Sequence, residues 1–241
     1  MRQKTALGYL FVFAFLMGAG CAGLPPIVSP DNSCAPDEQS LSREVNALFP
    51  ADSFQFVHAI ELTMPGSHSA MLMGVVNIHP QHRAIHCVVM TLEGLVLFEA
   101  DHTSEAFIIH RVIPPFDSQA FARGLVSDIE LIFFRPRGRL DAWGTLENKN
   151  TILRFSEPDG GTIDLVVSPD RTIWTQNLRN SSHRIKRCVT YLFPQGATNS
   201  QAPVFPRSIT LTAAFPSRYT LTMTLTDASL ITDTLPCGDN K

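Results

Sequence analysis

The chain has 241 residues, of which 44% are hydrophobic, and its formal net charge is −3. This length allows one sizeable core, and a single all-β domain of this size is ordinary. A mildly acidic chain lacks the basic footprint of a nucleic-acid-binding protein, so we expect no nucleic-acid partner.

The N-terminus has the features of an export signal. Arg2 and Lys4 form a short positive region, and an uncharged run from 7 to 17 follows. A positive start, an apolar run of this length and small residues ahead of a cleavage point are typical of such signals. The run is shorter than the ~20 apolar residues that a membrane-spanning helix needs. We therefore expect residues 1–20 to be a signal peptide.

The end of this signal resembles the lipobox of bacterial lipoproteins, because Gly18-Ala19-Gly20 leads directly into Cys21. The resemblance implies that Cys21 is acylated and anchors the protein to membrane lipid, with Ala22 behind it favouring the outer membrane and a periplasm-facing domain. The alternative is an ordinary secretory signal cut near Ala22, which leaves Cys21 without a role.

Residues 21–52 have the composition of an extended tether. They contain the five prolines Pro25, Pro26, Pro30, Pro36 and Pro50, together with Ser, Asp and Asn, as semi-rigid spacers do. Residues 41–49 could form a short helix within it. We expect residues 53–241 to form one folded domain.

Cysteine number fits an oxidising compartment. With Cys21 set aside, Cys34, Cys87, Cys188 and Cys237 remain, an even number that allows three pairings. Cys34 and Cys237 flank the folded region, so a bridge between them could join its two ends. Cys87 and Cys188 lie in strand-like sequence and could pair or remain buried thiols.

The domain begins with strand-like sequence over 54–62. Every second residue is apolar or aromatic and points one way, which is the pattern of a half-buried strand. This set consists of Phe54, Phe56, His58, Ile60 and Leu62.

The next expected strand, 70–78, is apolar on both faces. One face carries Met71, Met73 and Val75, and the other carries Leu72, Val76 and Ile78. Such strands are buried on both sides or line an apolar cavity, and methionine can repack around varied hydrophobic shapes. We include Met71, Met73 and Val75 among the expected ligand-binding residues, with plain core packing as the alternative.

The one convincing amphipathic helix runs from Asp117 to Pro136, after further strands over 85–90, 95–98 and 107–112. Asp117 can cap its N-terminus, and Pro136 ends it. Apolar residues recur at every fourth position and form a stripe. This stripe consists of Phe121, Leu125, Ile129 and Phe133.

Arg135, Arg137 and Arg139 follow the helix. They could complement the helix C-terminus or contact anionic lipid headgroups. Six more strands are expected, over 151–155, 162–167, 172–178, 185–193, 208–215 and 219–226. The fold class is therefore mainly β with one helix (α+β), a sheet of about ten or eleven strands.

This order of elements resembles the lipoprotein localisation factors LolA and LolB over about 54–226. Residues 84–98 (AIHCVVMTLEGLVLF) are similar to their strand–loop–strand centre, and 124–136 (GLVSDIELIFFRP) to their helix. The resemblance implies a curved antiparallel half-barrel closed by one main helix over an apolar cavity for acyl chains. By the same resemblance, Leu92 protrudes from its loop toward cargo or membrane, although Glu93 beside it departs from the family's loop.

Other chemistry has weaker support. His79 and His82 flank a turn and His86 lies mid-strand with no nearby carboxylate to orient it, so we expect no metal site. No G-x-S-x-G elbow exposes a serine, and Ser67-His68-Ser69 offers no ordered base. Asp128 and Glu130 do not share a helix face, and Asp128 is interpreted as a hydrogen-bonding or solvated residue. We expect no catalytic residues and no cofactor.

The expected protein is a monomeric, non-enzymatic lipoprotein of the bacterial cell envelope. It would bind acyl chains or lipoproteins as cargo between the helix and the sheet. The expected lining consists of Phe54, Phe56, Ile60, Met71, Met73, Val75, Phe121, Leu125, Ile129 and Phe133. The alternative is a structural or assembly lipoprotein whose apolar faces only form a dry core.

Overall fold

The computed structural model describes residues 23–28, 45–46, 49–66, 68–114, 116–195, 204–214 and 218–232. The expected signal peptide (1–20), the acylation candidate Cys21 and the proposed Cys34–Cys237 bridge lie outside these ranges. No helix in the described ranges has both the length and the apolar character needed to cross a membrane.

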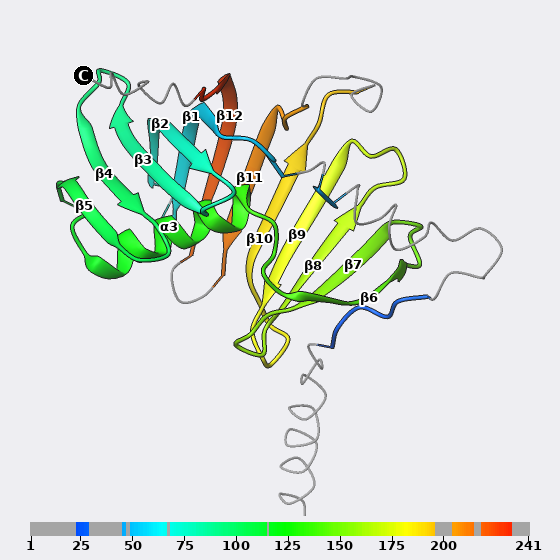
Figure 1. Cartoon of the computed structure of the whole chain (residues 1–241). Coiled ribbons are helices and arrows are strands. Elements are labelled where there is room, and N and C mark those ends of the chain that lie inside the picture. The colour runs from blue at the N-terminus through cyan, green and yellow to red at the C-terminus, as the bar shows by residue number, and fades with distance from the viewer. Residues whose placement is uncertain are drawn as a thin grey trace, which may run out of the picture.

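Twelve antiparallel strands form one open, curved sheet (Figure 1). The first five strands are β1 (Phe54–Met64), β2 (His68–His79), β3 (Ala84–Thr91), β4 (Val96–His102) and β5 (Phe107–Val112). After the helix come β6 (Arg139–Thr145), β7 (Thr151–Ser156), β8 (Thr162–Val167), β9 (Ile173–Arg179), β10 (Ile185–Leu192), β11 (Ser208–Ala213) and β12 (Tyr219–Leu230).

The order across the sheet is β5-β4-β3-β2-β1-β12-β11-β10-β9-β8-β7-β6. Each half is a meander, and β12 returns to pair with β1, which joins the two halves at the centre. The predicted antiparallel half-barrel is confirmed. The prediction of ten or eleven strands missed β6, whose Arg139 and Asp141 interrupt the apolar pattern. These charges suit β6, because it is an edge strand with one side exposed to water.

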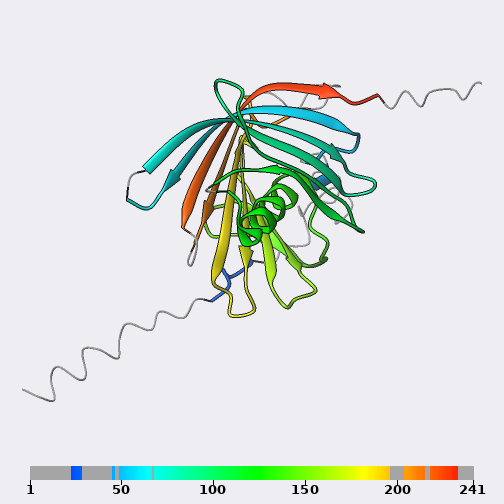
Figure 2. The same ribbon diagram turned by 90° about the vertical axis from the view of Figure 1, so that its left-hand side faces the viewer.

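Helix α3 (Gln119–Phe133) lies inside the curve of the sheet, as Figure 2 shows. Its N-cap is Ser118, whose hydroxyl accepts a hydrogen bond from the Phe121 amide at 3.1 Å, so the predicted cap at Asp117 is wrong by one residue. The helix ends at Phe134, which is extended and donates its amide to the Glu130 carbonyl. Pro136 follows two residues later and prevents the helix from resuming.

The buried face of α3 is rotated from the predicted stripe. Ala122, Val126, Ile129 and Phe133 are buried, and they recur at the helical spacing of three or four residues. Phe121 is 36% exposed and Leu125 is half-buried. At the N-terminal end of the predicted stripe, Phe121 and Leu125 therefore lie at the margin of the contact between helix and sheet. At its C-terminal end, Ile129 and Phe133 lie within that contact.

The N-terminal segment 23–28 packs against the edge of the sheet at β6. Val28 and Thr145 exchange two backbone hydrogen bonds, of 2.9 and 3.1 Å. A Cβ atom added at Gly144 would lie 2.5 Å from the Ile27 side chain, so only glycine allows this close approach. Within the segment expected to be a tether, Val45 and Phe49 are also buried in the core. These parts of residues 21–52 thus contact the domain.

Two of the five cysteines are described, and both carry free thiols. Cys87 is buried on β3 and its sulfur lies 3.7 Å from the Ala100 carbonyl oxygen. Cys188 is half-buried on β10. Of the two sequence alternatives for this pair, the structure has the buried-thiol arrangement.

Candidate binding site beneath the helix

Strand register decides which residues face α3. On β1, Phe56 lies opposite Val76 and Ile60 lies opposite Leu72, so these residues share the inner face. Residues directly opposite in an antiparallel pair point to the same side of a sheet. The inner face around β1 is therefore apolar across neighbouring strands.

Aromatic rings connect this inner face to the helix. Phe133 of α3 stacks on Phe56 with ring centroids 5.2 Å apart. Phe205, which precedes β11, meets both Phe54 and Phe56 edge-on with centroids 4.9 Å away. Offset and edge-to-face pairs are the favoured geometries of aromatic rings. The C-terminal half of α3 thus rests on a specific aromatic cluster.

The predicted lining is divided between two faces of the sheet. Phe54, Phe56 and Ile60 share the inner side with Ile129 and Phe133 of the helix. The remaining three strand residues do not join them: Met71, Met73 and Val75 lie opposite Glu61, Ala59 and Val57 on the outer side.

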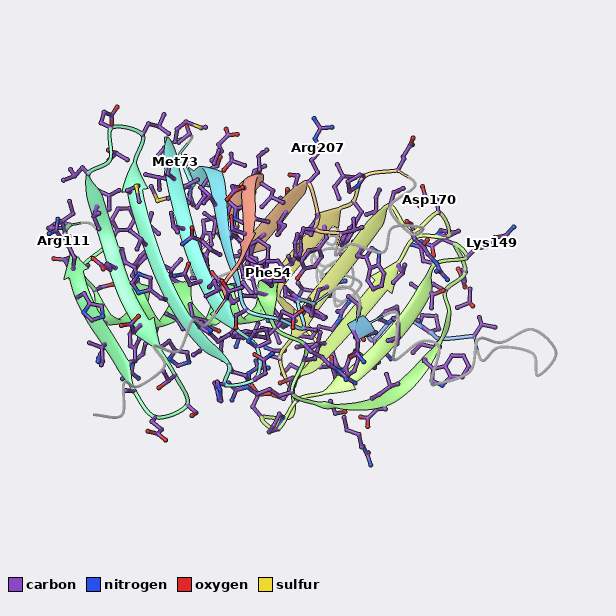
Figure 3. The ribbon with its side chains drawn as sticks, turned by 45° about the horizontal axis from the view of Figure 1, so that its top comes forward. Phe54, Met73, Arg111, Lys149, Asp170 and Arg207 are labelled. Atoms are coloured by element: carbon purple, nitrogen blue, oxygen red, sulfur yellow. The ribbon has the colours of Figure 1, made fainter. Side chains whose placement is uncertain are left out.

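The expected methionine wall of the cavity is therefore placed on the wrong face, because both faces of β2 are apolar and periodicity alone could not rank them. Met71 is 53% exposed there. Figure 3 labels Met73 of the outer set and Phe54 of the inner set, on neighbouring strands.

The two stripe residues near the start of α3 lie at the margin of the site. Phe121 contacts Phe116 and Phe98, with centroid distances of 5.0 and 6.3 Å. Leu125 is half-buried against the core. They border the space between helix and sheet and do not fill it.

A small cavity lies between the C-terminal end of α3 and the inner face. Its volume is about 20 Å³, which is room for roughly one water molecule. Its lining consists of Pro50, Phe56, His58, Ile132, Phe133, Tyr191, Phe205, Pro206, Ile209 and Leu225. This cavity is too small for an acyl chain, and an open acyl-chain cavity stays a prediction.

His58 is the residue of this site that the sequence prediction left out. It belongs to the inner set of β1 and is 1% exposed. Its ring lies 5.9 Å from the Phe133 ring and 6.2 Å from the Phe56 ring. Burial lowers the pKa of His58 to about 4, so the imidazole is neutral at pH 7. The available signal was its place in the alternating pattern, where it occupies an apolar position.

Tyr191 of β10 supplies a second polar group beneath the helix. Its hydroxyl lies 3.0 Å from Gln176 Oε1 and 3.1 Å from the Ile132 carbonyl oxygen. Burial raises the pKa of the Tyr191 phenol, so it remains a neutral hydrogen-bond donor. Its contact with the Ile132 carbonyl joins the last turn of α3 to the second half of the sheet.

An ion pair connects the middle of the helix to the sheet. Asp128, 3% exposed, accepts a hydrogen bond of 2.8 Å from Arg187 Nε on β10 and another from the Tyr219 hydroxyl on β12. Burial raises the pKa of Asp128, although the bonds from Tyr219 and Arg187 oppose that shift. Of the two interpretations of Asp128, the hydrogen-bonded one is confirmed and the solvated one is wrong.

Replacing Asp128 by asparagine is expected to lower the free energy of unfolding by about 1–3 kcal/mol, because Arg187 loses its charged partner in a mostly buried position. Urea denaturation at pH 7 measures this change. Asp141→Asn is the control, since its partner Arg139 is 87% exposed and exposed pairs contribute about 0–1 kcal/mol. Equal losses in both variants would contradict a buried attachment at Asp128.

A second set of charges holds the C-terminal end of α3. Glu130 Oε1 lies 2.7 Å from Arg137 Nη2 and 3.8 Å from Arg83 Nη2. The Arg83 guanidinium stacks over the Phe134 ring at 4.7 Å and donates to the Arg135 carbonyl. Together with Asp128, these contacts concentrate the polar attachments of the helix in its second half.

The three arginines after the helix have protein partners. Arg135 donates to Asn46 Oδ1 at 2.9 Å, and Arg137 pairs with Glu130. Arg139 pairs with Asp141 at 3.0 Å. These contacts support a structural role near the helix C-terminus. The lipid-headgroup interpretation stays untested.

The first half of α3 has more exposed residues than the second half. Gln119, Ala120, Phe121 and Arg123 are exposed. Gly124 lowers the intrinsic stability of this helical segment by about 0.5–1 kcal/mol relative to alanine. The helix is thus attached mainly through its C-terminal half.

Leu92 occupies the turn between β3 and β4, as the resemblance implied for a protruding loop. It is 58% exposed, and Leu95 in the same turn is 55% exposed. This turn lies at the same end of the sheet as the exposed Met64 at the end of β1, because β1–β2 and β3–β4 are antiparallel neighbours. Contact with cargo or membrane at Leu92 stays a prediction.

The histidines considered as metal ligands have other partners. His79 Nδ1 lies 3.0 Å from the Ser53 hydroxyl. His86 Nδ1 lies 2.7 Å from Asp101 Oδ1, so the expectation that it has no nearby carboxylate is wrong: pairing of β3 with β4 supplies one. Throughout the described ranges, no three His, Cys, Asp or Glu side chains are arranged to hold a metal ion.

Comparison with solved structures identifies the fold. The chain is similar to a LolA superfamily protein from Nitrosomonas europaea, with a TM-score of 0.53 and 15% identity over 82% of this chain and 95% of that chain. It is also similar to a domain assigned to outer membrane lipoprotein sorting from Vibrio parahaemolyticus, with a TM-score of 0.44 and 9% identity over 80% and 92% of the two chains.

A third similarity is to MucB, solved in complex with MucA(peri), with a TM-score of 0.24 and 10% identity over 78% of this chain and 94% of that chain. No protein-family model and no curated protein sequence matches the chain. The first similarity establishes a LolA-like fold, which confirms the resemblance drawn from the order of elements.

Proposed function

We propose that this protein is a cell-envelope lipoprotein that binds acyl chains, without catalysis, between α3 and the inner face of the sheet. In this proposal an acylated Cys21 anchors the protein to the outer membrane or to another membrane, and the domain faces the periplasm. The protein is a monomer, and its cargo consists of acyl chains or lipoproteins.

The observation that supports this proposal is the way one helix covers a broad apolar surface. The inner face is apolar on both halves of the sheet, from Phe56 on β1 to Val189 on β10 and Leu165 on β8. A helix attached mainly by its C-terminal half can move its N-terminal half away. Such movement would expose the inner face at the margin formed by Phe121 and Leu125.

Binding would follow from partition of the chain out of water. Each methylene group buried in an apolar site contributes about 0.8 kcal/mol, and displacement of the helix subtracts from that gain. On this proposal α3 moves as the chain enters, because the cavity of about 20 Å³ beside His58 is too small for an acyl chain. A modest net affinity suits a carrier that must also release its load.

The test uses a chain that begins at Ala22, since every described element follows that residue. Circular dichroism and a single cooperative thermal transition first establish that this chain is folded. Uptake of a fluorescent fatty acid and native mass spectrometry then measure binding. Lipid-sized adducts and saturable uptake support acyl-chain binding.

Two matched variants locate the binding surface. Leu125→Gln changes the half-buried margin of α3, and Met71→Gln changes the outer face of β2. We expect Leu125→Gln to weaken fatty-acid binding about tenfold, because it removes one apolar side chain worth ~1.5 kcal/mol from the site. We expect Met71→Gln to bind as the wild type does. Equal effects would contradict a site beneath the helix.

The small size of the cavity beside His58 favours one second candidate, a structural or assembly lipoprotein that binds no acyl chain. In that case the folded chain gives a clean protein mass and takes up no fluorescent fatty acid. Leu125→Gln then alters stability alone.

A further inference from the structure

We propose that His58 is the polar anchor of the site beneath α3, and that the ligand is an alkyl chain ending in a carbonyl or carboxyl oxygen that bonds to the imidazole Nδ1. This inference deepens the proposed acyl-chain binding and rests on it.

The first support is an unmet hydrogen-bonding atom inside an apolar site. His58 is 1% exposed, and its Nδ1 has no hydrogen-bond partner within the described part of the chain. An unsatisfied buried polar atom costs about 1–3 kcal/mol. The cavity beside the ring has room for one oxygen atom that could satisfy Nδ1, and in our proposal the ligand supplies it in place of water.

The second support is the position of His58 relative to free space. The cavity of about 20 Å³ is lined by His58 together with Phe56 of the sheet and Phe133 of the helix, whose rings stack with centroids 5.2 Å apart. This volume is room for one water-sized oxygen atom. An oxygen could therefore occupy it with the rings in their present places, while the alkyl chain needs the helix to move.

The third support is the absence of charge around the cavity. Within the described ranges, its lining contains no Lys, Arg, Asp or Glu side chain. A phosphorylated or cationic headgroup would be buried there without a counter-charge, which is strongly unfavourable. A neutral imidazole is suited to an acyl ester, an acyl amide or a protonated carboxyl group. The shared feature of these ligands is one oxygen at the end of an alkyl chain.

The experiment compares ligands of equal size with and without the oxygen. Methyl dodecanoate and pentadecane, both delivered from cyclodextrin, compete with a fluorescent fatty acid for the folded chain that begins at Ala22. The measured quantity is the ratio of their dissociation constants in the wild type, divided by the same ratio in His58→Leu. This double ratio cancels differences in the solubility of the two ligands.

We expect the preference for the ester over pentadecane to be about tenfold larger in the wild type than in His58→Leu. This factor corresponds to the net free energy of one hydrogen bond. His58→Asn is the matched variant, because its amide can replace Nδ1, and it is expected to restore part of the preference. Dodecanoate separates the two sources of the oxygen: a preference for dodecanoate alone indicates free fatty acid, and a preference shared with the ester indicates any acyl group.

The two proposals fail in different ways. A double ratio near one, with both ligands still bound, overturns the role of His58 and leaves acyl-chain binding in place. Failure of the fluorescent fatty acid to bind overturns both proposals, and a bound probe that no ligand displaces overturns the role of His58 alone. Recovery of the preference in His58→Asn excludes a defect in folding as the cause of its loss in His58→Leu.

Discussion

Phe133→Ala is expected to lower the free energy of unfolding by about 3–5 kcal/mol, the usual cost of removing a buried phenylalanine from a core. Phe133 is 5% exposed and stacks on Phe56 across the contact between helix and sheet. Its removal deletes the aromatic contact and enlarges the cavity beside His58. Urea denaturation monitored by circular dichroism measures the loss.

Phe121→Ala is the matched control, because the two phenylalanines belong to the same predicted stripe. Phe121 is 36% exposed at the start of the helix, so its truncation is expected to cost about 1 kcal/mol or less. Comparable losses for the two variants would mean that the helix buries the predicted stripe along its whole length and would contradict the observed rotation of its buried face.

The second large effect concerns pH. Because burial depresses the pKa of His58 from 6.5 to about 4, the folded chain disfavours its charged form. Between pH 6.5 and pH 4 the unfolded chain takes up a proton at His58 that the folded chain does not. The stability from neutral His58 is therefore complete above pH 6.5 and decreases as the pH falls to 4. At ~1.4 kcal/mol per pH unit, the loss reaches about 3 kcal/mol.

His58→Leu isolates this contribution, since leucine does not titrate. The difference in unfolding free energy between wild type and His58→Leu should change by about 3 kcal/mol from pH 7 to pH 4. The raised pKa of Asp128 acts in the opposite direction, because its contribution decreases as the pH rises above 3.8, and the subtraction removes it. A pH-independent difference would show that His58 reaches water in the folded protein.

These predictions separate two properties of the same helix. Phe133 tests how firmly its C-terminal half is held, and Leu125 tests whether its N-terminal half borders a ligand site. The polar attachments at Asp128 and Glu130 lie in the second half, so loss of either should weaken the closed arrangement. Acyl-chain binding then depends on the balance between this attachment and the apolar surface that opening makes available.

The sequence by itself determined most of the local structure. Alternating residues over 54–62 and the glycine- and proline-bearing turns place strands correctly, because period-two patterns depend only on neighbouring residues. The helix was recognised from its 3.6-residue periodicity, and its end from Pro136. The LolA-like fold followed from the order of these elements. Strand β6 was missed because an edge strand need not be apolar on either side.

The tertiary structure alone decided which apolar faces meet. Both faces of β2 are apolar, so only its register with β1 shows that Leu72 and Val76 face the helix while Met71 and Met73 face outward. The burial of Asp128 and the partner of His86 likewise depend on strands distant in the sequence. The volume left beneath α3 depends on how all the facing side chains interlock. The periodicity of one segment cannot predict this volume, because it depends on how two surfaces pack together.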